Sequence, residues 1–289
     1  MSTPFIFTDH AGIELAARKW DPAGEPVAAV HVLHGLGEHL DRYDEFAQEL
    51  TKAGFVVYGY DQRGHGRSIG DGEPGQIGAD GWTGLVDDIG DFGRLIRESE
   101  PGRKLAIVAH SMGSFATQQF LLKDSSTHDA VALTGTAALD LLEPALDLDA
   151  PLDLAAFNAG FVPPRTEFDW LTRDEKIVDA YVADPLCGFG LDPGATKEWF
   201  AGARELADPD KVAAIRSDLP VYLAVGDKDP INGGLALFNP LVDRLRAAGI
   251  ADLTAKVYPD ARHEILNETN RAEVFADLIG WLHDHVDAG

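Results

Sequence analysis

The sequence predicts an α/β fold in which a mostly parallel central sheet is covered by helices on both faces. Short apolar runs alternate along the chain with stretches in which apolar residues recur at helical spacing. Such alternation is typical of parallel strands joined by helices. The alternation stops over residues 137–215, where prolines are frequent and apolar residues are irregular, and then resumes. We therefore predict a core made of residues 1–136 and 216–289, with a mainly helical lid inserted at 137–215.

The first half of the chain contains most of the predicted strands. Two runs flank the turn at His10-Ala11-Gly12 and predict an antiparallel hairpin at the sheet edge. The predicted strands are Phe5–Thr8, Ile13–Lys19, Val27–Leu33, Phe55–Tyr60, Lys104–Ala109 and Ala130–Leu133. Apolar residues at intervals of three and four predict helices over Leu40–Leu50, Trp82–Ile96 and Phe115–Leu122.

The second half repeats the pattern after the insertion. The run LPVYLAV, Leu219–Val225, predicts a strand, and a helix follows through Leu237, Leu241 and Leu245. Leu253–Tyr258 predicts the last strand, and Val274–Val286 predicts the closing helix.

Composition excludes several function classes. The chain has 289 residues, of which 45% are hydrophobic, and 48 acidic against 24 basic residues give a net charge of −24. Such a charge repels nucleic-acid phosphates and anionic lipid, so we expect no nucleic-acid partner. No apolar run approaches the roughly 20 residues that a membrane span needs, so we expect no stable membrane insertion. The polar N-terminal residues do not fit a signal peptide, and a cytoplasmic location is the expectation.

The one cysteine, Cys187, lies in the apolar stretch PLCGFG and is predicted to be a buried, non-catalytic thiol.

The stretch IVAHSMGSF raises the question of whether Ser111 is a nucleophile or a serine that caps a helix. A nucleophilic serine often lies in G-x-S-x-G between a strand and a helix. Here Ala109 stands where the first glycine is expected, while Gly113 keeps the second. A slightly wider turn can hold the extra methyl group, and the strand-turn-helix setting favours a nucleophile.

A serine nucleophile needs a base and an acid that orients the base. The loop after the last strand, YPDARHEI, offers His263 as the base. His110 is expected to point along the sheet instead. In GDKDPIN, after LPVYLAV, Asp227 and Asp229 compete for the role of the acid. Asp227 follows a glycine and suits a turn, whereas Asp229 lies farther along the loop and is favoured.

An oxyanion hole needs two backbone N–H groups aimed at the developing charge. Met112, directly after the nucleophile and at a helix N-terminus, offers one. In HGLGEH the glycines Gly35 and Gly37 let the backbone pass close to a substrate, which points to the Leu36 N–H as the other.

Several segments together resemble one family. His34 to Ser68, with HGxGEH and Y-D-x-R-G-H-G-x-S, is similar to the signature stretch of the monoglyceride lipase and lysophospholipase group of α/β-hydrolases, which overlaps the serine aminopeptidase-like hydrolases. The segments x-H-S-M-G, G-x-x-D and R-H-E follow in the family's order.

The resemblance implies an α/β-hydrolase fold with a catalytic triad of Ser111, Asp229 and His263. It implies oxyanion positions at Leu36 and Met112. No ligand cluster or nucleotide motif appears in the sequence, so no metal or cofactor is expected. The resemblance also implies a mainly structural role for the loop that holds Asp61, Arg63 and His65.

The lid carries little of the resemblance. Aromatic side chains at Phe157, Phe161 and Trp170, with Phe168, are either the lining of an acyl-chain pocket or the lid's own small core. An alternative is that acidic lid residues hold a substrate's amino terminus, as in an iminopeptidase. These residues are Glu143, Asp147, Asp149 and Asp153.

The predicted function is hydrolysis of a small, neutral, moderately apolar carboxylic ester, such as a monoacylglycerol, through an acyl-enzyme. Three alternatives stay open from the sequence. They are a prolyl-type aminopeptidase, a hydrolase of carbon–carbon bonds that uses the same triad, and a ligand-binding protein with a vestigial triad.

Overall fold

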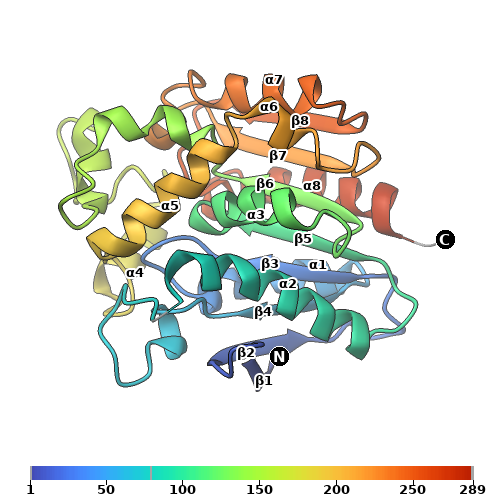
Figure 1. Ribbon diagram of the computed structural model, residues 1–289. Helices are drawn as coiled ribbons and strands as arrows, with labels where there is room; N and C mark the ends of the chain where they lie inside the picture. The colour runs from blue at the N-terminus through green and yellow to red at the C-terminus, as the bar shows by residue number, and fades with distance from the viewer. Residues whose placement is uncertain (1, 79, 288–289) are drawn as a thin grey trace.

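The computed structural model describes residues 2–78 and 80–287, and its centre is one eight-stranded sheet (Figure 1). The strands lie in the order β1-β2-β4-β3-β5-β6-β7-β8. From β4 to β8 every neighbouring pair is parallel, whereas β1 and β2 pair antiparallel with each other and β2 pairs antiparallel with β4. The predicted mostly parallel sheet and its antiparallel edge hairpin are confirmed.

The strand bounds follow the apolar runs of the sequence. They are β1 Ser2–Thr8, β2 Glu14–Trp20, β3 Ala29–Leu33, β4 Val56–Tyr60, β5 Leu105–His110, β6 Ala130–Thr134, β7 Val221–Gly226 and β8 Leu253–Tyr258. Residues of β3, β4, β5, β6 and β7 are buried throughout, because helices cover these strands on both faces.

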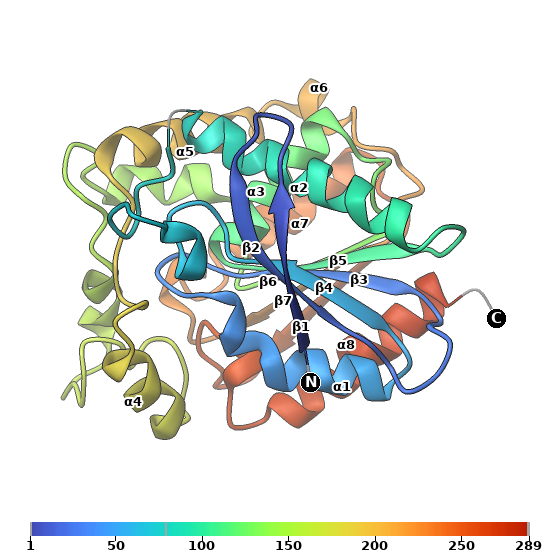
Figure 2. The same ribbon diagram turned by 90° about the horizontal axis from the view of Figure 1, so that it is seen from below.

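Two layers of helices cover the sheet, as the view onto the sheet edge from below shows (Figure 2). One face carries α2 Gly81–Ser99, α3 Met112–Lys123 and α7 Phe238–Ala247, and the other carries α1 Asp44–Lys52 and α8 Arg271–Val286. Alternate residues of one strand enter the two layers: Ile107 of β5 packs with the first group of helices and Val108 with the second. The predicted helix over Leu40–Leu50 is divided into a 3₁₀ turn, η1 Leu40–Tyr43, followed by α1.

The chain between β6 and β7 forms short helices, the first of which lie at the end of the sheet where the parallel strands finish (Figure 1). Their bounds are η3 Leu139–Leu141, η4 Glu143–Ala145, η5 Leu154–Gly160, α4 Glu175–Ala183, α5 Pro193–Glu205 and α6 Pro209–Val212. The last two pack on the helix layer of α2, α3 and α7. Asp153, Asp174, Asp192 and Asp208 each cap the helix that follows by accepting a backbone N–H. Aspartate caps and prolines therefore determine where these short helices begin, and the segment has no long amphipathic helix.

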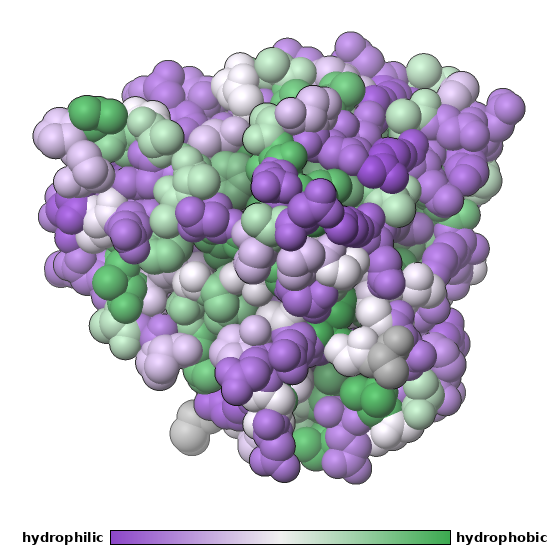
Figure 3. All heavy atoms as spheres, turned by 60° about the vertical axis from the view of Figure 1, so that its left-hand side comes forward, coloured by the Kyte–Doolittle hydropathy of each residue, from purple (hydrophilic) through white to green (hydrophobic). Residues whose placement is uncertain are grey.

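The outer surface on this side mixes polar and apolar side chains (Figure 3). Three large apolar residues of the segment between β6 and β7 are well exposed, namely Val162 at 82%, Val182 at 52% and Leu141 at 43%. In the part of the chain that the structure describes, no helix combines the length and apolar character needed to cross a membrane.

Candidate active site

Ser111 lies at a sharp turn between β5 and α3 and has a backbone conformation that is rare for a residue with a side chain. Its φ of 49° and ψ of −120° lie outside the regions that are comfortable for L-residues, at a cost of roughly 1–3 kcal/mol. The side chain makes no capping hydrogen bond to α3. Instead, Ser111 Oγ lies 2.8 Å from His263 Nε2. The helix-capping interpretation of this serine is therefore wrong.

The two small positions around the turn have different reasons to be small. Ala109 is a fully buried residue of β5, with a backbone that needs no glycine. At Gly113, by contrast, an added Cβ would lie 2.5 Å from the carbonyl oxygen of His34. The chain therefore needs a glycine after the serine, where α3 meets the loop that follows β3, and tolerates alanine before it.

His263 is held between the serine and one of the two candidate carboxylates. Its Nδ1 lies 2.9 Å from Asp229 Oδ2, and Asp229 is 1% exposed. A carboxylate only accepts, so Nδ1 carries the proton and Nε2 presents a lone pair to Ser111 in the neutral ring. The other oxygen of Asp229 accepts the backbone N–H of Ile231 at 2.8 Å, which fixes the carboxylate.

Asp227 points elsewhere. Its Oδ1 accepts the backbone N–H of Asp260 at 2.8 Å and so joins the two loops that follow β7 and β8. The structure thus brings Asp229, and not Asp227, to His263.

The surroundings of His263 favour a proton acceptor near neutral pH. Burial disfavours the charged imidazolium and by itself lowers the pKa of His263. The Asp229 carboxylate and its hydrogen bond act in the opposite direction and outweigh burial, so the pKa of His263 is raised above its ordinary value.

His110 differs from its predicted orientation. Its ring centroid lies 4.8 Å from that of His263, and its Nδ1 lies 3.0 Å from Thr134 Oγ1. At the end of β5 the alternation of side chains turns His110 towards the face covered by α1 and α8, from which the His263 loop comes. Burial, followed by the neighbouring His263, lowers the pKa of His110 well below its ordinary value.

The loop after β3 packs directly on the serine turn. A Cβ added at Gly35 would lie 3.0 Å from Ser111 Cβ, and Gly37 has a φ of 64°. His34 anchors the start of this loop: its Nδ1 donates to the Gly35 carbonyl at 2.7 Å and its Nε2 accepts from Gln62 N at 2.9 Å. The predicted oxyanion residues Leu36 and Met112 therefore lie on two segments in contact beside Ser111.

A buried ion network that the sequence did not reveal fixes the same loop. Glu38 accepts the N–H of Gly35 at 2.6 Å and the hydroxyl of Tyr43 at 2.7 Å. Arg42 donates to Glu38 at 2.5 Å and makes two bonds of 2.6 Å to Glu264, the residue after His263. This network ties the loop after β3 to the His263 loop. The only sequence signals were the acidic residues inside HGLGEH and RHE.

Of the predicted lid residues, Trp170 comes closest to the triad. Its ring centroid lies 5.0 Å from that of His263, and its carbonyl accepts the His263 N–H at 3.3 Å. Phe157 packs on Trp170 at 5.3 Å. Phe161 lies over the Arg262 guanidinium at 4.6 Å, and Phe168 packs on Tyr181 at 5.0 Å. Trp170 therefore lies beside His263 with Phe157 packed behind it, whereas the contacts of Phe161 and Phe168 are with other side chains.

The acidic lid residues are engaged locally. Glu143 pairs with Arg204, Asp149 pairs with Lys197, and Asp153 caps η5. Asp147 accepts the backbone N–H of Asp149. The four carboxylates therefore bind partners within residues 137–215 and give no support to a site for an amino terminus.

The turn-rich loop after β4 is structural. Asp61 accepts the backbone N–H groups of Leu40 and Arg67 at 2.8 and 2.9 Å, and Arg63 is buried between Asp9 and Asp88. The scaffolding role predicted for Asp61 and Arg63 agrees with these contacts.

The chain is similar to known proteins over most of its length. The sequence model of the family described as "Serine aminopeptidase, S33" matches residues 24–270. The monoacylglycerol lipase of Mycolicibacterium smegmatis is 29% identical over 285 residues, which cover 97% of this chain and 96% of that protein. The monoglyceride lipase of Rattus norvegicus is 30% identical, over 89% of this chain and 82% of that protein.

Solved structures share the fold. A thermostable carboxyl esterase from Bacillus coagulans has a TM-score of 0.86 at 24% identity and covers 98% of both chains. A soluble variant of the Saccharomyces cerevisiae monoglyceride lipase has a TM-score of 0.80 at 20% identity, over 100% of this chain and 96% of that chain. With the family's sequence model matched from residue 24 to residue 270 and this fold shared, the chain belongs to the S33 serine aminopeptidase family of α/β-hydrolases.

Proposed function

We propose that the protein hydrolyses carboxylic esters through an acyl-enzyme, with Ser111 as nucleophile, His263 as base and Asp229 as the acid that orients His263. The observation that carries this proposal is the continuous relay of 2.8 Å from Ser111 Oγ to His263 Nε2 and 2.9 Å from His263 Nδ1 to Asp229 Oδ2. The strained backbone of Ser111 supports the same role, because strain of this kind gathers at reactive sites.

The chemistry proceeds in two halves. Ser111 Oγ attacks the ester carbonyl while His263 Nε2 takes the hydroxyl proton. The amides of Leu36 and Met112 stabilise the oxyanion, and collapse of the intermediate expels the alcohol, which receives the proton from His263. Water then attacks the acyl-enzyme with His263 again as base, and the carboxylic acid leaves as Ser111 regains its proton.

The substrate class that we propose is a small, neutral, moderately apolar ester, with monoacylglycerols as the leading candidates. Two curated relatives that align over most of this chain are named monoacylglycerol or monoglyceride lipase. Trp170, on which Phe157 packs, supplies apolar surface beside His263 for such a substrate. We also propose residues 137–215 as the lid, and a cytoplasmic location stays a prediction.

A panel of substrates tests this assignment. We expect p-nitrophenyl esters and monoacylglycerols of increasing acyl length to be hydrolysed, and prolyl p-nitroanilide to be a far poorer substrate. Faster cleavage of the prolyl amide than of every ester would favour the aminopeptidase, and turnover of a dienone-type diketone alone would favour the carbon–carbon hydrolase. No turnover of any ester would contradict the proposal.

The pH profile should report His263. Because Asp229 raises the pKa of His263, the rising limb of kcat/KM should have its midpoint above pH 6.5, and activity should fall as the ring becomes protonated below it. In Asp229→Asn the two largest contributions that oppose burial are lost, so the midpoint of the residual activity should move to lower pH. A wild-type midpoint below pH 6.5 would contradict the assignment of base and acid.

Substitutions at the two small positions beside the serine should affect different quantities, stability at Ala109 and kcat at Gly113. Ala109→Gly should lower the free energy of unfolding by about 1 kcal/mol and leave kcat nearly unchanged, since β5 needs no glycine there. Gly113→Ala should lower kcat by about 10²-fold, because the new methyl group displaces the loop after β3 from the serine turn. Denaturant unfolding and steady-state kinetics of both variants measure this, and equal kcat values for the two variants would contradict it.

A further inference from the structure

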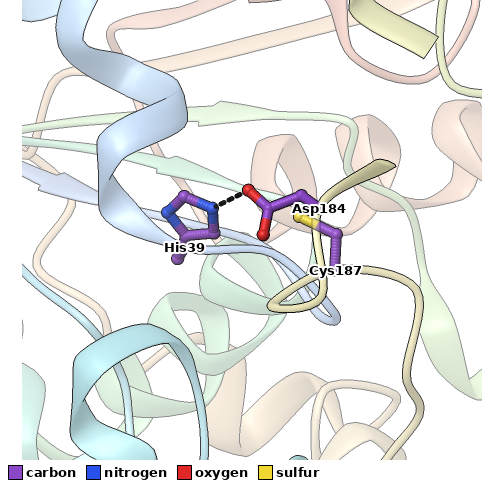
Figure 4. A group of neighbouring side chains, drawn as sticks. All are labelled: His39, Asp184 and Cys187. Carbon is purple, nitrogen blue, oxygen red and sulfur yellow. Dashed lines mark hydrogen bonds and ion pairs between the residues drawn. The ribbon is translucent and has the colours of Figure 1, made fainter. Parts of the chain in front are cut away.

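Three side chains with different metal-binding groups meet where the lid touches the loop after β3 (Figure 4). They are His39 on that loop and Asp184 and Cys187 in the segment after α4. One donor atom from each lies within 4.8 Å of the other two, and His39 Nε2 is 2.9 Å from an oxygen of Asp184. His39 is 7% exposed, so the imidazole is fixed by its surroundings.

We propose that His39 Nε2, the Asp184 carboxylate and Cys187 Sγ bind a divalent transition metal ion of the zinc type, which bridges the lid and the loop after β3. Imidazole, thiolate and carboxylate together are the ligands that zinc and cobalt take in proteins, whereas magnesium and calcium prefer oxygen alone. Three protein ligands leave a fourth tetrahedral position for water.

The lid side of the site is already ordered. The backbone N–H of Leu186 donates to Asp184 Oδ1 at 2.8 Å, and that of Cys187 donates to the Asp184 carbonyl at 3.1 Å. This tight turn holds the carboxylate and the thiol on one side. Tetrahedral bonds of about 2.0–2.3 Å bring donor atoms to roughly 3.5 Å apart, so the three groups need shifts of about 1 Å or less.

The protons can be accounted for at each ligand. In the neutral ring, His39 Nε2–H donates to Asp184, and among the described residues the buried Nδ1 has no hydrogen-bond partner. The ring proton can therefore move to Nδ1 without breaking a bond there, and the ion takes its place between Nε2 and the carboxylate. The thiol releases one proton as the S–metal bond forms.

The local charge favours a cation. Cys187 is half-buried and packs against the hydrophobic core, so its apolar setting agrees with the expectation and its burial is only partial. Arg42, Asp184 and Cys187 line one small cavity of about 170 Å³. The positive charge of Arg42 is more than balanced by its two carboxylate partners, Glu38 and Glu264, and Asp184 adds a further negative charge.

Contacts around the site indicate what the ion would reinforce. The backbone N–H of Gly188 and the hydroxyl of Tyr181 both donate to the Gly37 carbonyl, at 2.9 and 2.8 Å. Gly37 follows the proposed oxyanion residue Leu36. A bound ion would therefore act as a structural clamp between the lid and this loop, independently of the ester chemistry.

Cobalt(II) is the probe for this site, because Cys187 is the chain's one cysteine and any thiolate-to-cobalt absorption must come from it. We expect chelator-treated wild-type protein titrated with cobalt to develop this near-ultraviolet band and the intense visible bands of a tetrahedral centre. Cys187→Ala should lose the near-ultraviolet band entirely, and Asp184→Asn should bind cobalt at least ten-fold more weakly.

His285→Gln is the matched control. His285 Nε2 lies 3.0 Å from Asp252 in a histidine–aspartate pair much like that of His39, but without a thiol. Its cobalt titration should equal that of the wild type, and thermal unfolding without metal checks that each variant is folded. Absence of the thiolate band in the wild type, or undiminished affinity in folded Asp184→Asn, would overturn the proposal. Loss of affinity in His285→Gln would also overturn it.

Discussion

Ser111→Ala is expected to reduce kcat for ester hydrolysis by about 10⁴–10⁶-fold, because the variant has no atom that can form the acyl-enzyme. In this variant His263 Nε2 lies beside a methyl group, which has no acidic proton for the imidazole to accept. What activity remains should come from the oxyanion amides and substrate binding acting on water. The fold should persist, because Ser111 Oγ makes no hydrogen bond that caps α3.

Ser114→Ala is the matched control for this prediction. Ser114 is buried one turn away and donates its hydroxyl to the Ser111 carbonyl at 2.7 Å. The substitution therefore removes a buried hydroxyl group without changing a residue of the triad. We expect Ser114→Ala to retain kcat within about ten-fold and to lose roughly 1 kcal/mol of stability. A fluorophosphonate probe followed by mass spectrometry should label wild type and Ser114→Ala but not Ser111→Ala. Unchanged hydrolysis by folded Ser111→Ala would exclude the proposed mechanism.

Much of the architecture was predictable from the sequence because it depends on local pattern. The apolar runs at β3, β5 and β7 are completely buried, and a strand covered on both faces is mostly apolar. Strand ends then mark one edge of the sheet, where ligands bind in folds of this kind. Ser111 and His263 could be proposed for that reason, each in a loop directly after a strand.

The buried ion network was not predictable in the same way. Arg42 and Glu264 are 222 positions apart in the chain, and no periodicity relates them. The orientation of His110 was also missed, although strand alternation beyond Ala109 contained the signal, because β5 was expected to end one residue earlier. The individual helices of residues 137–215 were not predicted, because capping residues, and not a repeating apolar face, determine where they begin.

The local sequence pattern does not distinguish the role of Asp227 from that of Asp229. Both carboxylates follow β7 within three residues, and both suit a turn. The difference between them lies in the direction of each side chain. Asp227 accepts from the backbone of Asp260 across the loop, and Asp229 caps the turn η6 Pro230–Asn232 with one oxygen while the other reaches His263. Only the three-dimensional path of this loop separates the two roles.

Asp229→Asn is therefore expected to lower kcat by about 10⁴-fold, while Asp227→Asn should lower it by less than about ten-fold. The amide keeps the size of the carboxylate but removes the charge that balances the imidazolium, and its NH₂ group can stabilise the wrong tautomer of His263. Asp227→Asn keeps an oxygen that can accept the Asp260 N–H, so the loop should retain its shape. Steady-state kinetics of both variants, with circular dichroism to confirm folding, compare two isosteric changes two residues apart. A large loss in Asp227→Asn with a small one in Asp229→Asn would reverse the assignment. Because the two variants lose the same charge from the same loop, a difference of several orders of magnitude between them cannot come from net charge or loop stability, and must come from contact with His263.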